Sequence, residues 1–175
     1  MVDDVIRSLG LLCLGSRLKR LGERLQASTE EIVVAAGVTP GPSQHPMLVA
    51  LARHGPLTVG DLAEALGVSQ PGITRSLVRF EALGLVESAP AAGDQRRRLV
   101  GLTPEGRVLV DDLSRRLWPV VAAAVADLCA DLDGGLLDQV AAIEDRLEAR
   151  PLVERRPGEG VALKPIDVAP APRTE

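Results

Sequence analysis

Aromatic residues are almost absent from this chain of 175 residues, which contains one Phe, one Trp and no Tyr. Nucleic-acid sites that stack bases on protein rings, such as RNA-recognition sheets and single-strand platforms, require several exposed aromatic side chains. The composition therefore argues against both of these classes of site. Because 46% of the residues are hydrophobic, a folded core is still expected, and that core must be aliphatic.

Cysteine and histidine are also scarce. Cys13 and Cys129 are the only cysteines, and neither belongs to a CxxC pattern or lies near a pair of histidines. His45 and His54, the only histidines, have no carboxylate or thiol neighbours at the spacing that metal ligation requires. The sequence is not that of a disulfide-stapled module or a zinc module, and we expect neither a metal site nor a cofactor.

Long apolar runs are missing as well. None approaches the roughly 18 residues that cross a bilayer, and the N-terminus, MVDDVIRSLG, begins with acidic residues rather than the basic ones of a signal peptide. We therefore expect a cytoplasmic protein without a membrane partner. The length favours one folded domain over residues 1–150, followed by a Pro-rich and weakly patterned tail over residues 151–175 with little order.

Apolar residues recur at helical intervals from residue 3 to about residue 36, which predicts a long first helix. Three glycines, Gly10, Gly15 and Gly22, each lower its intrinsic stability by up to about 1 kcal/mol relative to alanine, so packing against other segments must sustain it. The breaker-rich stretch TPGPSQHP ends this helix, and MLVALARHG predicts a second one that ends at Gly55.

The segment LTVGDLAEALGVSQPGITRSLVRFEALG predicts a helix-turn-helix. Thr58 and Asp61 have the spacing of a capping box at the start of a short helix. Gly67 suits the left-handed end of that helix, and Ser69 suits the N-cap of the next one. Pro71 falls in the first turn of the second helix, where proline is tolerated. This second helix has an apolar stripe on one side and polar residues on the other, namely Gln70, Thr74, Arg75 and Arg79.

Two short strands, LVES and RRLVGL, follow this helix and are separated by the turn-rich segment APAAGDQ. A hairpin directly after a recognition-type helix is a wing. Three consecutive arginines, Arg96, Arg97 and Arg98, lie on its far side and returning strand, in a chain whose formal net charge is −4. Asp94 precedes Arg96 by two residues, a spacing at which a carboxylate can brace a guanidinium. This local concentration of positive charge predicts a negatively charged partner.

Beyond the wing, the pattern is helical again. Thr103 is a predicted N-cap followed by Pro104. Pro119 is expected to kink or split the helix that runs to Trp118, because an interior proline costs about 3 kcal/mol. The segment LLDQVAAIEDRLEAR predicts a last amphipathic helix. The predicted fold is therefore mainly α, a winged helix-turn-helix core with a small β-hairpin wing and helices on both flanks.

The major groove of double-stranded DNA admits one helix, whose N-terminal side chains can meet base edges. We expect Arg75 to contact a base and Arg79 a phosphate, although the reverse assignment stays open. Gly72 either allows close approach to the DNA or only relieves crowding near the turn. One wing arginine is expected in a minor groove and its neighbours on phosphates, and the sequence does not say which one. The predicted DNA contacts are Ser69, Gln70, Gly72, Thr74, Arg75, Arg79, Asp94, Arg96, Arg97 and Arg98.

Residues 47–107 resemble the winged-helix core of MarR-type transcriptional regulators. They contain LTVGDLAEALGVSQPGITRSLVRFEALGLVES, then Asp94-x-Arg96-x-x-x-Val100-x-Leu102-Thr103, and then PEGR. The resemblance implies a homodimer in which the first and last helices pair across a two-fold axis. It implies a repressor or activator on a pseudo-palindromic operator, often released by a small ligand or an oxidant.

The flanking segments further resemble the regulator half of proteins that fuse a MarR-like domain to a GNAT acetyltransferase. The chain ends about two dozen residues after Pro151, so no acetyltransferase activity is expected.

The same resemblance raises two further candidate sites. Some MarR-like peroxide sensors have a reactive cysteine in the first helix, but tyrosines hydrogen-bond its thiolate there, and this chain has none. Because no cation or helix N-terminus is evident beside Cys13, we expect a buried small hydrophobe rather than a redox sensor. Trp118 is a candidate wall of an effector pocket, with Arg17 and Arg20 as partners for an anionic group. Packing at a kink and a solvated helix face are the simpler explanations. The aliphatic composition favours an apolar effector.

Two rival classes of function remain. An enzyme is not expected, because the sequence has no nucleophile–base pair, no Gly-rich phosphate loop followed by Lys, and no metal constellation. The alternative is a winged helix that serves as a protein-interaction module or as the regulatory partner of a separate enzyme. Exposed Thr74, Arg75 and wing arginines argue against that alternative.

Overall fold

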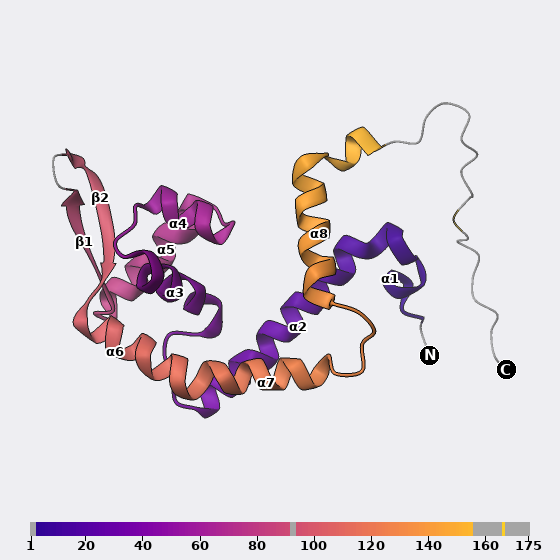
Figure 1. The fold of residues 1–175 in the computed structure, drawn as a ribbon, viewed down its shortest axis with the longest axis horizontal. Helices are drawn as coiled ribbons and strands as arrows, with labels where there is room; N and C mark the ends of the chain where they lie inside the picture. Colours follow the sequence, from indigo (N-terminus) through magenta and orange to yellow (C-terminus); the bar gives the residue numbers. More distant parts are fainter. Residues whose placement is uncertain (1–2, 92–93, 156–165, 167–175) are drawn as a thin grey trace. The chain divides into compact units, whose positions relative to one another are not determined.

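The computed structural model describes residues 3–91, 94–155 and 166. Its helices are α1 (Val5–Ser8), α2 (Leu14–Ala35), α3 (His45–His54), α4 (Val59–Leu66), α5 (Gln70–Ala82), α6 (Pro104–Asp112), α7 (Trp118–Leu128) and α8 (Leu136–Ala149). Short 3₁₀ segments are η1 (Gly10–Cys13), η2 (Pro42–Gln44) and η4 (Leu152–Arg155), and η3 (Leu113–Leu117) is a π-helix. The strands are β1 (Val86–Ala91) and β2 (Asp94–Leu102) (Figure 1). The predicted mainly helical fold with a two-stranded wing is confirmed.

Contacts divide the chain into two units, each described by itself below. The central unit comprises residues 20–125, and the terminal unit comprises residues 1–19 and 126–175. The central unit holds the winged helix. Within the described residues, no helix combines the length and the apolar character that a membrane span would need.

The central unit contains the predicted helix-turn-helix. The Thr58 hydroxyl accepts from the Asp61 N–H at 3.1 Å and the Asp61 carboxylate accepts from the Thr58 N–H at 3.0 Å, which confirms the capping box at the start of α4. Gly67 ends α4 at φ +62°, a left-handed conformation that favours glycine. Helix α3 ends at Gly55 as predicted, but it begins two residues before Met47, at His45.

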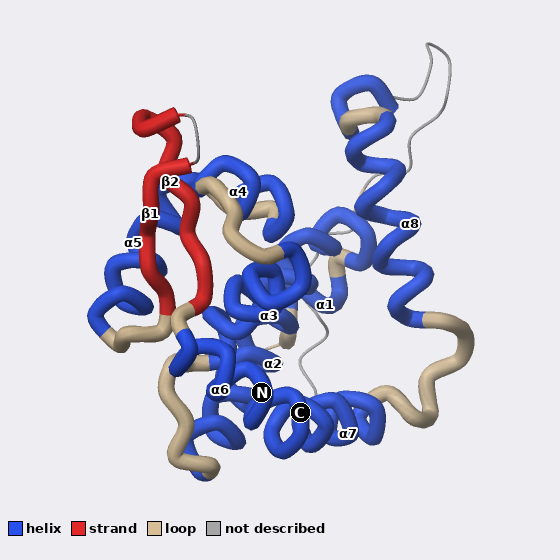
Figure 2. Tube along the Cα trace, turned by 60° about the vertical axis from the view of Figure 1, so that its left-hand side comes forward, coloured by secondary structure: helices blue, strands red, loops and turns tan. Residues whose placement is uncertain are grey.

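The wing is an antiparallel hairpin of β1 and β2, and Figure 2 shows it beside α5. Val86 pairs with Leu102 and Pro90 pairs with Arg98, with a shift in register after Pro90. An isolated antiparallel β-bridge joins Leu57 to Val100 in β2. The Leu57 N–H donates to the Val100 carbonyl at 2.9 Å, and the Val100 N–H donates to the Leu57 carbonyl at 2.8 Å. The loop before α4 is thereby tied to the base of the wing.

An aliphatic core joins these elements. Fully buried side chains come from every layer of the winged helix, namely Val33, Leu48, Leu62, Ile73, Phe80, Val100 and Leu113. The apolar side of α5 packs inward, which leaves its polar side in solvent. Among the described residues, His45 is the one polar side chain that is buried with this core.

The first helix is interrupted, which corrects the prediction of one helix over residues 3–36. Helix α1 stops at Ser8, Gly10 adopts φ +54°, and the 3₁₀ segment η1 precedes α2. A residue in the left-handed region cannot continue a right-handed helix, and glycine enters that region without steric cost. Gly10 therefore interrupts the helix, whereas the sequence predicted that packing against other segments would keep the helix continuous.

Pro119, where the sequence predicted a kink or a split, is preceded by a change of helix type rather than by a loop. The helical path continues from α6 through η3 into α7, and the N–H of Trp118 bonds the carbonyl of Leu113, five residues earlier. Proline lacks an N–H, and its ring clashes with the carbonyl four residues before it. The wider π turn accommodates this with a local change of helix type.

In the terminal unit, apolar side chains are left in solvent. No residue of α8 is buried, and Leu137 is 81% exposed. Leu11 in η1 is 86% exposed. Cys13 and Cys129 also belong to this unit and are half-buried free thiols, so Cys13 is less enclosed than the buried hydrophobe that the sequence predicted.

The start of the Pro-rich tail forms a short 3₁₀ segment, and the low order of the tail as a whole stays a prediction. Residues 152–155 form η4, where the Arg155 Nε donates to the carbonyl of Arg150 at 2.8 Å. The Arg150 side chain in turn donates to the carbonyl of Glu154. Arginine side chains thus satisfy backbone carbonyls after the end of α8. The rest of the tail, apart from residue 166, lies outside the described residues.

Candidate nucleic-acid interface

Ser69 precedes the first residue of α5, and the sequence predicted that its side chain caps this helix. Ser69 is at the N-cap position with φ −69° and ψ 145°, but its hydroxyl makes no capping hydrogen bond. Such a bond would go to the second or third N–H of the helix. Pro71 has no N–H, and the N–H of Gly72 already bonds the carbonyl of Ser69 at 2.9 Å. The exposed Ser69 hydroxyl is therefore not used as the predicted cap.

Gln70, Thr74 and Arg75 are exposed on the first half of α5, as predicted. The Thr74 hydroxyl donates to the carbonyl of Gln70 at 3.0 Å, which orients it along the helix. A hydroxyl that donates in this way still has lone pairs for a second contact. This end of α5 thus presents an amide, a hydroxyl and a guanidinium to solvent.

Arg75 and Arg79 are the two cations on the exposed side of α5. Within the described residues, neither makes an ion pair or a hydrogen bond. The sequence left open that a surface acid such as Glu81 neutralises them. Glu81 instead accepts a hydrogen bond from the Ser88 hydroxyl at 2.6 Å, so it is engaged with β1. Both guanidinium groups remain available to a partner.

Gly72 lies in the first turn of α5, three residues before Arg75. It is half-buried and borders a cavity of about 270 Å³ together with Met47 and Ser76. An added Cβ there would lie 3.4 Å from the Ser69 hydroxyl, which supports relief of crowding as the reason for glycine. Its role in a close approach to DNA stays a prediction.

On the wing, Arg98 is held against the opposite strand. Its Nη2 donates to the carbonyl of Ser88 at 3.0 Å, and the side chain remains exposed. Asp94, Arg96 and Arg97 are part of β2, but their side chains lie outside the described residues, and so does the predicted brace between Asp94 and Arg96. The side chain of Arg98 therefore links β2 to β1.

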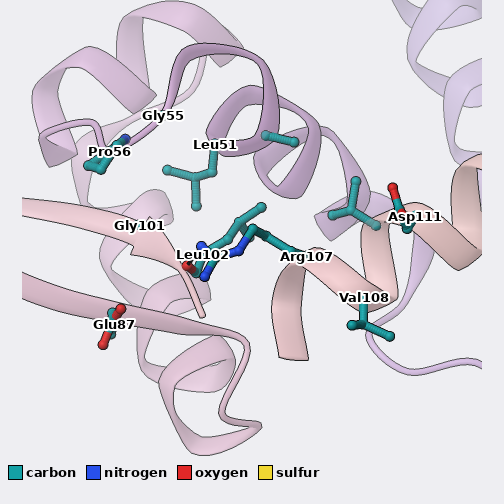
Figure 3. Close-up of a pocket in the computed structure, with 11 residues that line it drawn as sticks. Leu51, Gly55, Pro56, Glu87, Gly101, Leu102, Arg107, Val108 and Asp111 are labelled. Carbon is teal, nitrogen blue, oxygen red and sulfur yellow. Dashed lines mark hydrogen bonds between the residues drawn. The ribbon is translucent and has the colours of Figure 1, made fainter. Parts of the chain in front are cut away.

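A groove of about 640 Å³ lies between α3, the base of the wing and α6 (Figure 3). Arg107 projects into it and donates from Nη1 to the carbonyl of Leu102 at 2.6 Å. This bond joins the end of β2 to α6. Arg107 belongs to the PEGR motif, and no residue spacing indicates this contact because it depends on how α6 packs.

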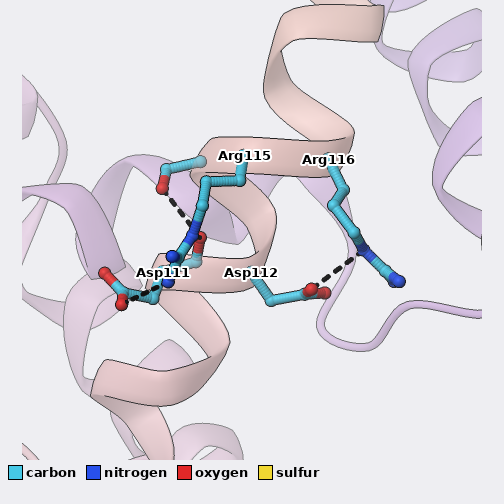
Figure 4. A network of polar contacts seen from close by, with 5 residues as sticks. Asp111, Asp112, Arg115 and Arg116 are labelled. Atoms are coloured by element: carbon cyan, nitrogen blue, oxygen red, sulfur yellow. Dashed lines mark hydrogen bonds and ion pairs between the residues drawn. The ribbon is translucent and has the colours of Figure 1, made fainter.

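The arginines of η3, which follows α6, are paired with acidic side chains. Arg115 pairs with Asp111 at 2.6 Å, and Arg116 pairs with Asp112 at 2.8 Å (Figure 4). Both pairs are largely exposed and join residues four apart on the same helical path. These arginines differ from Arg75 and Arg79, because they have intramolecular acid partners.

Trp118 lines a cavity, and its role in an effector pocket stays a prediction. The cavity has a volume of about 420 Å³, and its walls include Thr29, Val49 and Val121. His45, which sequence spacing did not single out, also lines it. Arg20 is not among the lining residues, and Arg17 belongs to the terminal unit. The apolar wall is thus present in the central unit, without the predicted cation Arg20.

Comparisons with known proteins agree on the class of fold. The sequence model of the MarR family matches residues 36–97. The transcriptional regulator FarR of Neisseria gonorrhoeae is 29% identical over 130 residues, which cover 73% of this chain and 88% of FarR. The transcriptional repressor NicR of Pseudomonas putida is 39% identical over 64 residues, which cover 37% of this chain and 40% of NicR.

Solved structures of the same architecture include complexes. A cysteine-to-serine mutant of E. coli MarR bound to operator DNA has a TM-score of 0.64 at 22% identity, over 84% of this chain and 98% of that one. Bordetella bronchiseptica BpsR, whose DNA binding is regulated by 6-hydroxynicotinic acid, has a TM-score of 0.59 at 22% identity, over 78% and 91%. These likenesses concern the fold.

Proposed function

Because this chain belongs to the MarR family of DNA-binding, winged-helix transcriptional regulators, we propose that it is a homodimeric repressor of a pseudo-palindromic operator, released by a small effector. The observation that carries the DNA-binding part is the exposed side of α5, where Arg75 and Arg79 have no acid partner within the described residues. Gln70 and Thr74 beside them can contact base edges in the major groove.

The proposed homodimer rests on the terminal unit. Four apolar residues of α8 follow one another at intervals of four, three and four positions, namely Leu136, Val140, Ile143 and Leu147. Each is more than a third exposed in the single chain. An apolar stripe of this spacing is typical of a helix that packs against another helix. A second copy of the chain would bury it and place two α5 helices on one duplex.

The proposed effector response rests on the cavity beside Trp118. Its apolar walls and the polar edge of the indole suit a small, largely apolar molecule. NicR supports the repressor assignment, and BpsR offers a precedent for control of DNA binding by a small aromatic compound. The genes that the protein regulates would indicate the chemical class of the effector.

Genomic selection tests the function directly. Purified full-length protein is mixed with fragments of the source genome, and the retained fragments are sequenced. Enrichment of a short inverted repeat supports the proposal. A folded protein that retains no DNA would favour the alternative, a winged helix that only binds proteins.

Ile143→Asp is expected to convert the dimer into a folded monomer, because it places a charge in the middle of the apolar stripe of α8. The side chain is 38% exposed in the single chain, so the monomer itself should tolerate the change. Sedimentation equilibrium measures the mass, and far-ultraviolet circular dichroism checks the helices. Asp145→Asn, on the same helix but off the stripe, is the control and should remain dimeric. An unchanged mass for Ile143→Asp would contradict this dimer interface.

Arg79→Ala is expected to weaken binding to operator and to random DNA by similar factors, because we assign Arg79 to a phosphate. A phosphate contact releases counterions, so the slope of log affinity against log salt should fall by about 1 for each copy of the site. Fluorescence anisotropy with a labelled duplex over a salt series measures both quantities. A loss confined to the operator, with the slope unchanged, would reverse the assignments of Arg75 and Arg79.

A further inference from the structure

His45 is a buried histidine whose two ring nitrogens both have partners. It is 7% exposed and is the first residue of α3. Its Nε2 lies 2.9 Å from the carbonyl oxygen of Pro40, and its Nδ1 lies 3.2 Å from the indole Nε1 of Trp118. The two rings are tilted by 53° with centroids 6.0 Å apart. One imidazole therefore joins the loop before α3 to the first residue of α7.

The chemistry of the two partners determines the proton position. A carbonyl oxygen only accepts, so Nε2 must carry the hydrogen that it donates to Pro40. An indole N–H only donates, so Nδ1 must be unprotonated to accept from Trp118. Both bonds exist together only in the neutral imidazole. A second proton on Nδ1 would place two N–H donors against each other and end the contact with Trp118.

Charged and polar groups reach His45 from three elements, namely α2, the loop before α3 and α7. On α2, the carboxylate of Glu30 raises the pKa of His45 and lies against Gly41, where an added Cβ would be 3.0 Å from its Oε2. The loop contributes the carbonyl of Pro40, and α7 contributes the indole. Within the described residues, the other side chains around the cavity carry no titratable group, namely Thr29, Pro42, Pro46, Val49 and Val121.

We propose that His45 and Trp118 form a proton-operated latch between α3 and α7. In the closed state the neutral imidazole accepts the indole N–H. In the open state the imidazolium has lost Trp118 and is stabilised by Glu30 and the carbonyl of Pro40. The latch holds the start of α7 against the winged helix at one point, directly after the π turn of η3. Its opening frees the indole, which also forms a wall of the 420 Å³ cavity.

The direction of the pH response follows from burial. Desolvation lowers the pKa of His45 below its ordinary value of 6.5, and the opposing effects of Pro40 and Glu30 are smaller. The unfolded chain therefore takes up this proton at a higher pH than the folded chain does. The stabilisation by the neutral imidazole is complete above pH 6.5 and is lost as the pH falls toward the lowered pKa. The latch is closed at neutral pH and opens in acid.

Trp118 is the only tryptophan of the chain, so its fluorescence reports the latch without labelling. We expect a reversible change in emission between about pH 8 and about pH 5, because protonation of His45 removes the hydrogen-bond partner of the indole N–H. The midpoint should lie below 6.5. His45→Gln should remove the transition, because an amide can both donate and accept without titrating.

His54 supplies the matched control, since it is the only other histidine, is exposed, and lies at the opposite end of α3. His54→Gln should keep the transition. The proposal is overturned if the wild-type emission does not change, if His45→Gln titrates like the wild type, or if His54→Gln loses the response.

A second measurement needs no substitution of His45. Nitrogen-15 spectra of the wild-type protein at neutral pH should show the Nε2–H tautomer for His45, and the Nδ1–H tautomer would refute the latch. Trp118→Phe should raise the pKa of His45 in the same spectra, because it removes the partner that requires a neutral ring. Glu30→Gln should lower that pKa. If Trp118→Phe leaves the pKa of His45 unchanged, the latch is also refuted, and this test holds even if His45→Gln fails to fold.

The effect on DNA rests on the proposed function and has its own arm. If the latch sets how α7 leaves the winged helix, acid should weaken operator binding more in the wild type than in His45→Gln. If the wild-type protein shows no fluorescence transition, the latch is refuted, whatever the DNA result. If the wild-type fluorescence transition is present but pH does not affect operator binding, the latch exists and does not regulate DNA binding.

Discussion

Arg75→Ala is expected to abolish high-affinity operator binding while leaving the fold unchanged. Arg75 is exposed, has no partner within the described residues, and lies one turn into α5, where a side chain can reach a base edge. A bidentate contact between Arg and guanine provides about 1–3 kcal/mol of discrimination. A homodimer would lose it twice, which corresponds to roughly 30-fold to 10⁴-fold weaker binding.

The matched control is Arg116→Ala. Arg116 is equally a surface arginine on a helical segment, but its guanidinium is paired with Asp112. An exposed pair of this kind contributes at most about 1 kcal/mol to stability, so both variants should unfold at nearly the same temperature. Anisotropy titrations against the operator and a scrambled duplex measure the loss of discrimination. Equal operator affinities for Arg75→Ala and Arg116→Ala would refute the assignment of α5 as the reading helix.

Gly106→Ala is expected to destabilise the protein strongly, against the rule that alanine favours helices. Gly106 is buried in the first turn of α6, and an added Cβ would lie 2.1 Å from the carbonyl oxygen of Leu85. That carbonyl is backbone and already accepts from the N–H of Thr103 at 3.1 Å, so it cannot rotate away. Overpacking commonly costs about 1–3 kcal/mol, and we expect at least the upper end. Urea unfolding followed by circular dichroism gives the change in free energy.

Gly60→Ala is the matched control for this substitution. Gly60 is also in the first turn of a winged-helix element, α4, but an added Cβ would meet nothing closer than 3.7 Å. We expect a neutral or slightly stabilising effect, because alanine reduces the conformational freedom of the unfolded chain. Similar unfolding energies for Gly106→Ala and Gly60→Ala would mean that Leu85 and α6 can separate without cost.

Local signals account for the parts of the fold that the sequence predicted well. The capping box of Thr58 and Asp61, the left-handed Gly67 and the apolar stripe of α5 each act within a few residues, so spacing alone identifies them. The polar side of α5 follows from the same periodicity. The candidate DNA contacts Gln70, Thr74 and Arg75 could therefore be placed on an exposed surface before any tertiary contact was known.

Predictions that depended on competition between partners were less accurate. Ser69 has the residue type of a cap, yet Pro71 has no N–H to donate to its hydroxyl, and the N–H of Gly72 donates to the carbonyl of Ser69 instead. Arg98, from the triplet predicted to contact DNA, also bonds β1, and its contact with DNA stays a prediction. For both residues, a neighbouring backbone group is a partner that the residue type alone does not reveal.

The sequence by itself determined the helix-turn-helix, the wing and an exposed reading surface, because these depend on interactions between residues close in the chain. The tertiary structure alone decided why Gly106 must be glycine and that His45 meets Trp118. Those contacts join residues up to 73 positions apart. Their geometry depends on how whole helices pack, and no local spacing encodes it.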